Sequence, residues 1–276
     1  MLAFFVESCA FKSVVRTKNI PYLKKDSDAG VNGEKLNVFA PLKKGRLKEV
    51  LIFIHGGNWN SGNKKLYNYL GNRMARKGIV TVIIDYPLSP KAGYNEMAAD
   101  AALAVKWVRD NITLYGGDPG KIYLSGHSAG GHLAALVSIK NKYFDSLKIP
   151  NPIKGAILID AAGLDMYNYL ANEGLESGNT YLQTFTNDPK VWKEASPIYF
   201  LHPGMPSMLI YVGGKTYPSI KEGNERFIHV LKTIIPDPEY HIIKGKKHIP
   251  MILQFFNTHN SRYKEILQFM QNNKLM

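Results

Sequence analysis

Residues 122–131 read IYLSGHSAGG, which places Ser128 midway between Gly126 and Gly130. A short apolar run precedes this pattern, and an alanine-rich, helix-forming segment follows it. Glycines two residues before and after the serine allow a tight turn from strand to helix, in which the serine holds a strained backbone conformation with its hydroxyl exposed. The stretch therefore predicts a nucleophile elbow, with Ser128 as the nucleophile and the Ala129 N–H at the start of a helix, facing developing negative charge.

A second motif, HGGNW over residues 55–59, directly follows the apolar run of residues 50–54. An apolar strand ending in His-Gly-Gly is typical of a loop that turns backbone N–H groups toward an oxyanion. We expect the N–H groups of Gly57 and Asn58 to join that of Ala129 in such a hole, where one donor is worth about 10²–10³ in rate. His55 is expected to brace this loop by hydrogen bonding, because the base should follow the serine in the chain.

Short apolar runs alternate with helical patterns, which favours a mainly parallel, doubly wound sheet. We expect one domain, because 276 residues with 45% hydrophobic content can fill one large core and no linker or repeat divides the sequence. Apolar side chains at helical spacing over 97–112 and 263–270 predict helices that bury one stripe against the sheet. The expected strands are Lys35–Phe39, Val50–Ile54, Ile79–Ile84, Ile122–Leu124, Ala156–Ile159, Met208–Val212 and Tyr240–Ile243.

Five segments carry a family resemblance: HGGNW, DYPLSP at 85–90, the region around Trp107, YGGDPGKIYLSGHSAGGHLAAL at 115–136 and KKH at 246–248. They resemble the α/β-hydrolase superfamily, in its esterase-like branches that include bacterial feruloyl and acetyl esterases, kynurenine formamidases and the hormone-sensitive-lipase group. The resemblance covers roughly residues 35–271. It implies an α/β-hydrolase fold, with a mostly parallel central sheet and helices on both faces.

The regular alternation stops over residues 164–204, where aromatic side chains gather among polar ones. The resemblance implies a small lid insertion here, placed over the serine. Two interpretations of the aromatics stay open. They line an acyl or aryl pocket, or they form the insertion's own small core.

His248 is the expected general base. It follows the strand-like run 240–243 after a loop rich in lysine and glycine, and it precedes the last helix. A base on a loop beyond the end of a strand can reach the serine across the sheet. The resembling families place their histidine at this point of the chain.

The third member of a catalytic triad is the weak point of the pattern. In the resembling families an aspartate follows the strand equivalent to Met208–Val212, but this chain has Thr216 there. A threonine cannot neutralise an imidazolium, and replacing the triad Asp by a neutral amide costs about 10⁴ in kcat in serine proteases. Three interpretations stay open: an acid from elsewhere, a Ser-His dyad, or lost catalysis with binding retained. The preferred relocated acid is Asp165, after the preceding strand; the other candidates are Glu222 and Glu225.

The net charge of +13 comes from 35 basic and 22 acidic residues, and the lysines are scattered along the chain in pairs. Without a basic aromatic array or a nucleic-acid motif, the charge indicates a solvated surface and no nucleic-acid partner. The sequence has no metal-ligand cluster and no dinucleotide fingerprint, so we expect no cofactor and a small-molecule ester as the binding partner. The oligomeric state is not predicted.

Residues 1–34 are expected to form an N-terminal segment outside the hydrolase domain of residues 35–271. Cys9 is the only cysteine and follows an apolar start that resembles the end of a bacterial lipoprotein signal, although the stretch lacks the usual basic start. Two localisations therefore stay open. The chain is a lipoprotein tethered in the cell envelope through Cys9, or it has an ordinary cytoplasmic N-terminus.

Together these features predict a serine hydrolase that cleaves carboxylic esters through an acyl-enzyme on Ser128. Two alternatives stay open. One is an amide or formamide substrate, because HGGNW resembles formamidase loops as much as esterase loops. The other is a catalytically impaired binding protein, because Thr216 occupies the usual position of the acid.

Overall fold

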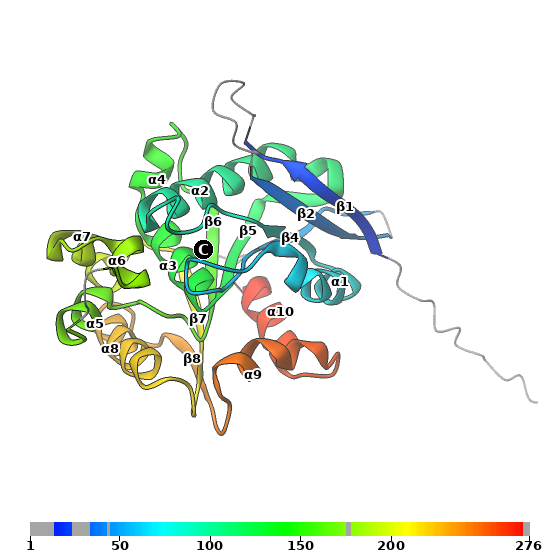
Figure 1. The fold of residues 1–276 in the computed structure, drawn as a ribbon. Helices are drawn as coiled ribbons and strands as arrows, with labels where there is room; N and C mark the ends of the chain where they lie inside the picture. The colour runs from blue at the N-terminus through cyan, green and yellow to red at the C-terminus, as the bar shows by residue number, and fades with distance from the viewer. Residues whose placement is uncertain (1–13, 24–33, 43–44, 175–177, 273–276) are drawn as a thin grey trace, which may run out of the picture.

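The computed structural model describes residues 14–23, 34–42, 45–174 and 178–272. Its centre is an eight-stranded sheet with the strand order β1-β2-β4-β3-β5-β6-β7-β8 (Figure 1). The strands are β1 Val14–Pro21, β2 Lys35–Pro41, β3 Lys48–Ile54, β4 Val80–Ile84, β5 Gly117–His127, β6 Ile153–Ile159, β7 Ser207–Gly213 and β8 Glu239–Ile243. The helices are α1 Asn68–Arg76, α2 Tyr94–Asn111, α3 Ala129–Ile139, α4 Lys142–Asp145, α5 Met166–Asn172, α6 Thr180–Phe185, α7 Pro189–Glu194, α8 Pro218–Ile234, α9 His248–Leu253 and α10 Arg262–Asn272.

The six strands from β3 to β8 pair in parallel, and only β1 and β2 run antiparallel to their neighbours. The central strands are buried on both faces, which explains why their sequences are continuous apolar runs rather than alternating ones. The predicted fold class, a mostly parallel sheet of the α/β-hydrolase type with helices on both faces, is confirmed.

The sheet starts at Val14, earlier than the predicted boundary at residue 35. Strand β1 pairs antiparallel with β2 at the sheet edge. Its sequence VVRTKNIP has no buried position and its register shifts between Thr17 and Ile20, so neither a continuous apolar run nor a clean alternation marks it. Residues 14–21 therefore belong to the hydrolase fold. Cys9 and its proposed lipid attachment lie outside the described residues.

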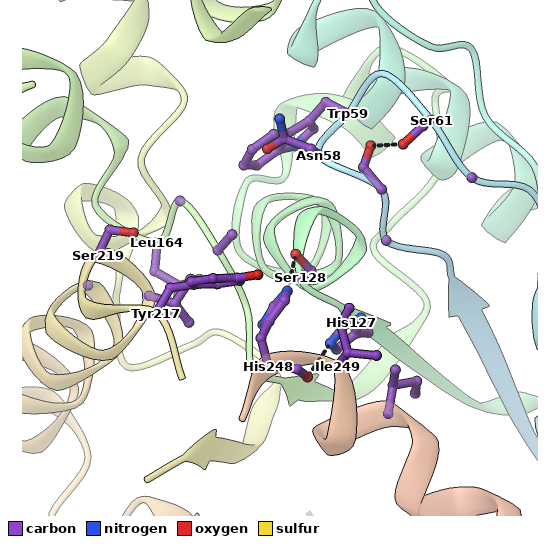
Figure 2. A pocket seen from close by; sticks show the side chains of 18 of the residues that line it. Asn58, Trp59, Ser61, His127, Ser128, Leu164, Tyr217, Ser219, His248 and Ile249 are labelled. Carbon is purple, nitrogen blue, oxygen red and sulfur yellow. Dashed lines mark hydrogen bonds between the residues drawn. The ribbon is translucent and has the colours of Figure 1, made fainter. Parts of the chain in front are cut away.

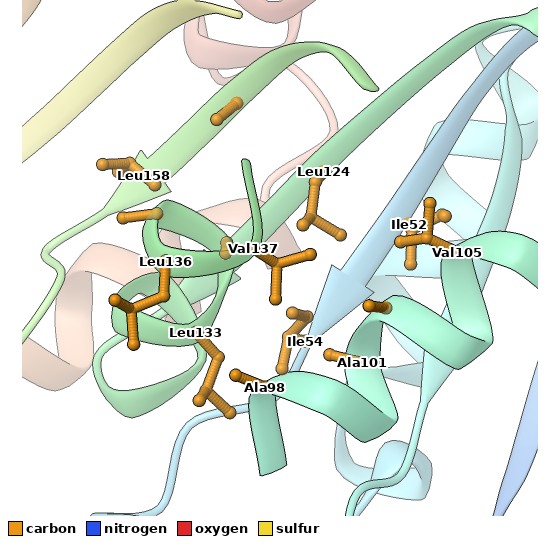
Figure 3. Close-up of a cluster of buried hydrophobic side chains, with 14 of the residues drawn as sticks. Ile52, Ile54, Ala98, Ala101, Val105, Leu124, Leu133, Leu136, Val137 and Leu158 are labelled. Atoms are coloured by element: carbon orange, nitrogen blue, oxygen red, sulfur yellow. The ribbon is translucent and has the colours of Figure 1, made fainter. Parts of the chain in front are cut away.

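Two hydrophobic cores cover the two faces of the sheet. One packs α2, α3 and α8 against the strands, and the other packs α1, α9 and α10 against the opposite face. Figure 3 shows the first core where α2 and α3 meet the strands, with Val105 of α2 and Val137 of α3 both directed at this layer. Helix α3 is buried along its whole length, so it has no polar face.

The parallel strands carry their carboxyl ends to one edge of the sheet. The segments that follow β3, β5, β6, β7 and β8 therefore begin close together, as the register pairs Ile54 with Gly126, His127 with Ile159 and Gly213 with Ile243 show. Loops at this edge are where doubly wound sheets bind ligands. The insertion between β6 and β7 comprises α5, α6, α7 and the 3₁₀ turn Pro197–Phe200, and Figure 1 shows these helices grouped far from β1 and β2.

A buried acid links β1 to the main domain. The Tyr22 hydroxyl, just after β1, donates to the Asp100 carboxylate on α2 and lies 2.5 Å from the backbone oxygen of Asp85. Burial raises the pKa of Asp100 to about 7, which the hydrogen bond from Tyr22 only partly opposes. The folded protein therefore disfavours the ionised carboxylate, and this destabilisation begins above the unfolded pKa of about 4 and is complete above about pH 7.

We expect Asp100→Asn to stabilise the protein in a pH-dependent manner. The amide keeps an acceptor for Tyr22 but removes the buried charge, so its advantage over the wild type should grow by about 1–3 kcal/mol between pH 4 and pH 8. Urea unfolding at both pH values measures this difference. A stability difference that is the same at the two pH values would contradict the assignment.

Candidate active site

Ser128 lies on the sharp turn between β5 and α3, with φ 57° and ψ −123°. The turn needs glycine on both sides. A Cβ on Gly126 would lie 2.2 Å from the Gly130 carbonyl, and a Cβ on Gly130 would lie 2.1 Å from the carbonyl oxygen of Ile54. The Ser128 N–H donates to the Ile159 oxygen of the neighbouring strand at 3.1 Å, which fixes the turn to the sheet. The predicted strand–turn–helix context of the elbow is therefore present.

Ser128, His248 and Asp160 form a continuous hydrogen-bonded chain. The Ser128 Oγ lies 2.9 Å from His248 Nε2, and His248 Nδ1 lies 2.6 Å from Asp160 Oδ2. Asp160 is completely buried and the other two residues are nearly so. A carboxylate only accepts, so Nδ1 carries the proton and Nε2 is left as the acceptor for the serine hydroxyl. Figure 2 shows the imidazole of His248 directed at Ser128.

The prediction that Asp165 holds His248 is wrong. Asp165 caps the N-terminus of α5, accepting from the Asn168 N–H at 3.2 Å, and pairs with Arg226 Nε at 2.9 Å. The two other candidates lie on α8, where Glu225 faces Lys221 at 3.9 Å and Glu222 is exposed. The prediction that the acid follows this strand was correct, but it named the wrong residue. Asp160 directly follows Ile159, the last residue of β6. Its place as the first polar residue after that strand is the sequence signal that could have identified it.

Asp160 is held by donors from the end of β7 and from the loop that follows it. The Gly213 N–H donates to Oδ1 at 2.7 Å, and the Thr216 hydroxyl donates to Oδ2, the oxygen that also faces His248. Thr216 therefore does not replace the missing acid. It orients an acid that comes from the neighbouring strand, and such donors satisfy the oxygens of a buried carboxylate.

The predicted oxyanion loop adopts an unusual backbone. Gly57, Asn58 and Trp59 follow one another with φ values of 128°, 50° and 59°. The Gly57 oxygen accepts from the N–H and hydroxyl of Ser61 at 2.9 and 2.8 Å, so this carbonyl is turned into the loop. Within the described part of the chain, no hydrogen bond uses the N–H of Gly57, Asn58 or Ala129. These three donors stay available for a ligand, and strained backbone of this kind is characteristic of functional sites.

His55 and His127 support the site from behind. His55 Nδ1 lies 2.8 Å from the Gly56 oxygen and its ring stacks on Tyr86, so it braces the loop as expected. His127 stacks on His248 with ring centroids 4.6 Å apart, and its Nε2 lies 3.2 Å from the His248 backbone oxygen. Burial lowers the pKa of His127 to about 3, which keeps the ring neutral. The sequence placed His127 inside the elbow but gave no sign of this contact.

A cavity of about 1050 Å³ opens above Ser128 and His248. Its walls come from the oxyanion loop, from the insertion, from the start of α8 and from α9. In the described residues, no group of three or more His, Cys, Asp or Glu side chains is placed to hold a metal ion. None of the described helices is long and apolar enough to cross a bilayer.

The aromatics of the insertion divide between the two interpretations. Tyr169 and Tyr181 line the cavity, with ring centroids 5.2 Å apart. Phe185 is fully buried and packs edge-on against Trp59 at 5.0 Å. The Trp192 indole donates to the Thr186 backbone oxygen at 2.9 Å and does not line the cavity. Part of the insertion is therefore core, and part of it faces the site.

The chain resembles known proteins in sequence and in fold. The BD-FAE family model matches residues 36–220. The isoprenylcysteine alpha-carbonyl methylesterase ICME of Arabidopsis thaliana is 28% identical over 241 residues, covering 80% of this chain and 55% of that protein. Esterase LipQ of Mycobacterium tuberculosis is 33% identical over 184 residues, covering 63% of this chain and 43% of that protein.

Among solved structures, a truncated carbohydrate esterase from gut microbiota superimposes with a TM-score of 0.79 at 19% identity, covering 94% of this chain and 96% of that one. This likeness concerns the fold. The chain spans about half the length of the curated relatives it matches. The family model, which covers most of the chain and includes both the oxyanion loop and the elbow, shows that this protein belongs to the BD-FAE family within the α/β-hydrolase fold.

Proposed function

We propose that this protein is a serine hydrolase that cleaves carboxylic esters of small molecules through an acyl-enzyme on Ser128. The observation that carries the proposal is the hydrogen-bonded chain from Ser128 through His248 to buried Asp160, at the base of a cavity. The esterase and methylesterase names of the relatives support the same reaction class.

In acylation, His248 Nε2 takes the proton of Ser128 as its Oγ attacks the ester carbonyl carbon. The carbonyl oxygen becomes an oxyanion, for which the N–H groups of Gly57, Asn58 and Ala129 are the proposed donors. His248 then gives the proton to the departing alcohol. In deacylation the same imidazole takes a proton from water as the water oxygen attacks the acyl carbon. The bond between this carbon and Ser128 Oγ then breaks, His248 returns the proton to Oγ, and the carboxylic acid leaves.

Asp160 has two roles in this scheme. It keeps the Nδ1–H tautomer of His248, so that Nε2 faces the serine, and its charge stabilises the imidazolium that forms in each half-reaction. The binding-protein hypothesis rested on the lack of an acid near Thr216, and the contact between Asp160 and His248 removes that ground. Cleavage of amides or formamides remains an alternative, which a substrate panel containing both bond types would test.

Ser128→Ala should fold normally and lose both labelling by a fluorophosphonate and ester turnover, by at least about 10⁴-fold in kcat. His248→Ala should give the same loss, and the double variant should be no worse than either single one, because the two residues act as a unit. Circular dichroism controls for folding. Ester turnover at the wild-type level in Ser128→Ala would remove this serine from the mechanism.

Asp160→Asn should lower kcat by about 10³–10⁴-fold, because a neutral amide no longer holds the productive tautomer of His248. Thr216→Asp should also lower the activity, although aspartate is the residue expected at this position in related sequences. Its carboxylate would meet that of Asp160 at hydrogen-bond range, and one of the two would have to take up a proton.

Thr216→Asn is the matched control, since it has the shape of aspartate without the charge. It should retain more activity than Thr216→Asp in steady-state assays at pH 8. A gain of activity in Thr216→Asp would show instead that Asp160 is not the working acid.

A further inference from the structure

The two ends of the cavity differ in chemistry. The end beneath the insertion is formed by Trp59, Met166, Tyr169, Glu173 and Tyr181, and it includes a carboxylate and two phenols. The opposite end, called here the apolar end, lies beside α9 and the 3₁₀ turns Lys64–Tyr67 and Gln254–Phe256. It is formed by Leu66, Tyr69, Ile249, Ile252, Leu253 and Phe256.

The apolar end gathers several of the exposed hydrophobic side chains of the described residues. Of the eleven large hydrophobic side chains that are exposed in the described residues, five line this cavity. Four of these belong to the apolar end: Leu66 is 62% exposed, Ile249 52%, Leu253 47% and Phe256 52%. Scattered exposed apolar residues need no explanation, but a contiguous group that opens into a reactive site indicates a binding surface.

Ring stacking and hydrogen bonds hold the side chains of the apolar end in place. The rings of Tyr69 and Phe256 stack with centroids 3.8 Å apart, and the Tyr69 hydroxyl donates to the Ile252 backbone oxygen at 3.0 Å. The Tyr67 hydroxyl, which lies beside this end, accepts from the Gly56 N–H at 3.3 Å. Both hydroxyl groups thus bind protein atoms, and both tyrosines line the cavity.

The apolar end leads directly to the reacting atoms. Ile249 follows His248 in the chain, and Figure 2 shows it on the side of His248 opposite to Tyr217 and Leu164. Among the described residues, no Asp, Glu, Lys or Arg lines this end of the cavity. A ligand group there gains from removal of apolar surface from water and finds no charge to pair with.

We propose that the apolar end binds a linear apolar chain attached to one side of the scissile ester, so that the preferred substrates are amphiphilic esters rather than short acetates. This inference rests on the proposed function of Ser128. The occupant is part of the substrate, because this surface is continuous with the cavity that contains the nucleophile.

The test measures kcat/KM for two series of esters, each below its critical micelle concentration. One series extends the acyl chain, from p-nitrophenyl acetate to octanoate, and the other extends the alcohol, from butyl to octyl acetate, followed by proton release. Because the apolar end is half open to water, we expect about a twofold gain for each added methylene in the series whose chain occupies it. The responding series identifies the acyl or the alcohol side.

Three leucine-to-glutamine variants locate the chain. Leu66→Gln and Leu253→Gln should each lower the ratio of long-chain to short-chain kcat/KM by about five- to tenfold. Leu114→Gln is the matched control, since Leu114 is exposed and lies outside the cavity, and it should leave the ratio unchanged. All three leucines are exposed, so none of the variants removes a core side chain.

Flat rates along both series, or a chain-length dependence that Leu66→Gln and Leu253→Gln leave intact, would overturn the proposal. Binding to phosphatidylcholine vesicles is measured in parallel. If the two variants abolish vesicle binding but keep the wild-type chain-length ratios, this surface docks on lipid and does not hold the substrate chain.

Binding of dansyl-labelled undecanoate to Ser128→Ala separates this inference from the proposed function. If the wild type hydrolyses no ester and is not labelled by fluorophosphonate, the proposed function fails. If Ser128→Ala binds the probe and the double variant Ser128→Ala/Leu253→Gln does not, the apolar end is still supported as a site for an apolar chain. If Ser128→Ala does not bind the probe, that role of the apolar end is refuted.

Discussion

The buried carboxylate of Asp160 is the point on which the site depends. A carboxylate with no exposure to water is tolerated only where hydrogen bonds replace its hydration. The protein supplies hydrogen-bond donors from two segments: Gly213 ends β7 and Thr216 lies just after it, and His248 begins α9. Asp160 itself stands at the end of β6. One carboxylate therefore ties three neighbouring segments of the sheet edge together, and the position of the imidazole is a consequence of this network.

The opposite side of the site depends on close backbone approach. Gly130 lies against the carbonyl of Ile54, so helix α3 is pressed onto the end of β3, from which the oxyanion loop departs. A side chain at Gly130 would push these two segments apart and separate the Ala129 N–H from those of Gly57 and Asn58. The elbow glycines thus allow the strained conformation of Ser128, and they also let the three N–H donors lie close together.

The parts of this arrangement that the sequence predicted are those specified by local pattern. Continuous apolar runs indicated the buried parallel strands, and the helix expected to start at Ala129 does start there. Ser128 and His248 were found because each sits in a recognisable strand-to-loop context. Strand β1 was missed because an exposed edge strand needs no apolar pattern, and none of its positions is buried.

The acid was missed for a different reason. The pattern of related sequences predicts an acid in the loop after β7, where this chain has Thr216. Other acids that follow β6 or β7 in the sequence were the remaining candidates. Which carboxylate meets His248 depends on the register of β6 against β7, and that register is a tertiary property. In the sequence, Asp160 and Asp165 are both acids shortly after the same strand. Only the packing distinguishes the one that turns inward from the one that caps α5 and pairs with Arg226.

The insertion is anchored to the catalytic framework through a buried histidine. Trp59 of the oxyanion loop donates its indole N–H to His132 Nδ1 at 3.1 Å, and His132 Nε2 donates to the Ala195 oxygen at 2.7 Å. Burial lowers the pKa of His132 to about 4, so the ring is neutral with one donor and one acceptor, as this chain of contacts requires. His132 and Phe185 together fix the inner part of the insertion to α3 and to the oxyanion loop. The inner part of the insertion therefore also shapes the oxyanion loop, so a change there would disturb catalysis. We expect the choice of substrate to depend instead on the cavity-facing side chains of the insertion and on the apolar end.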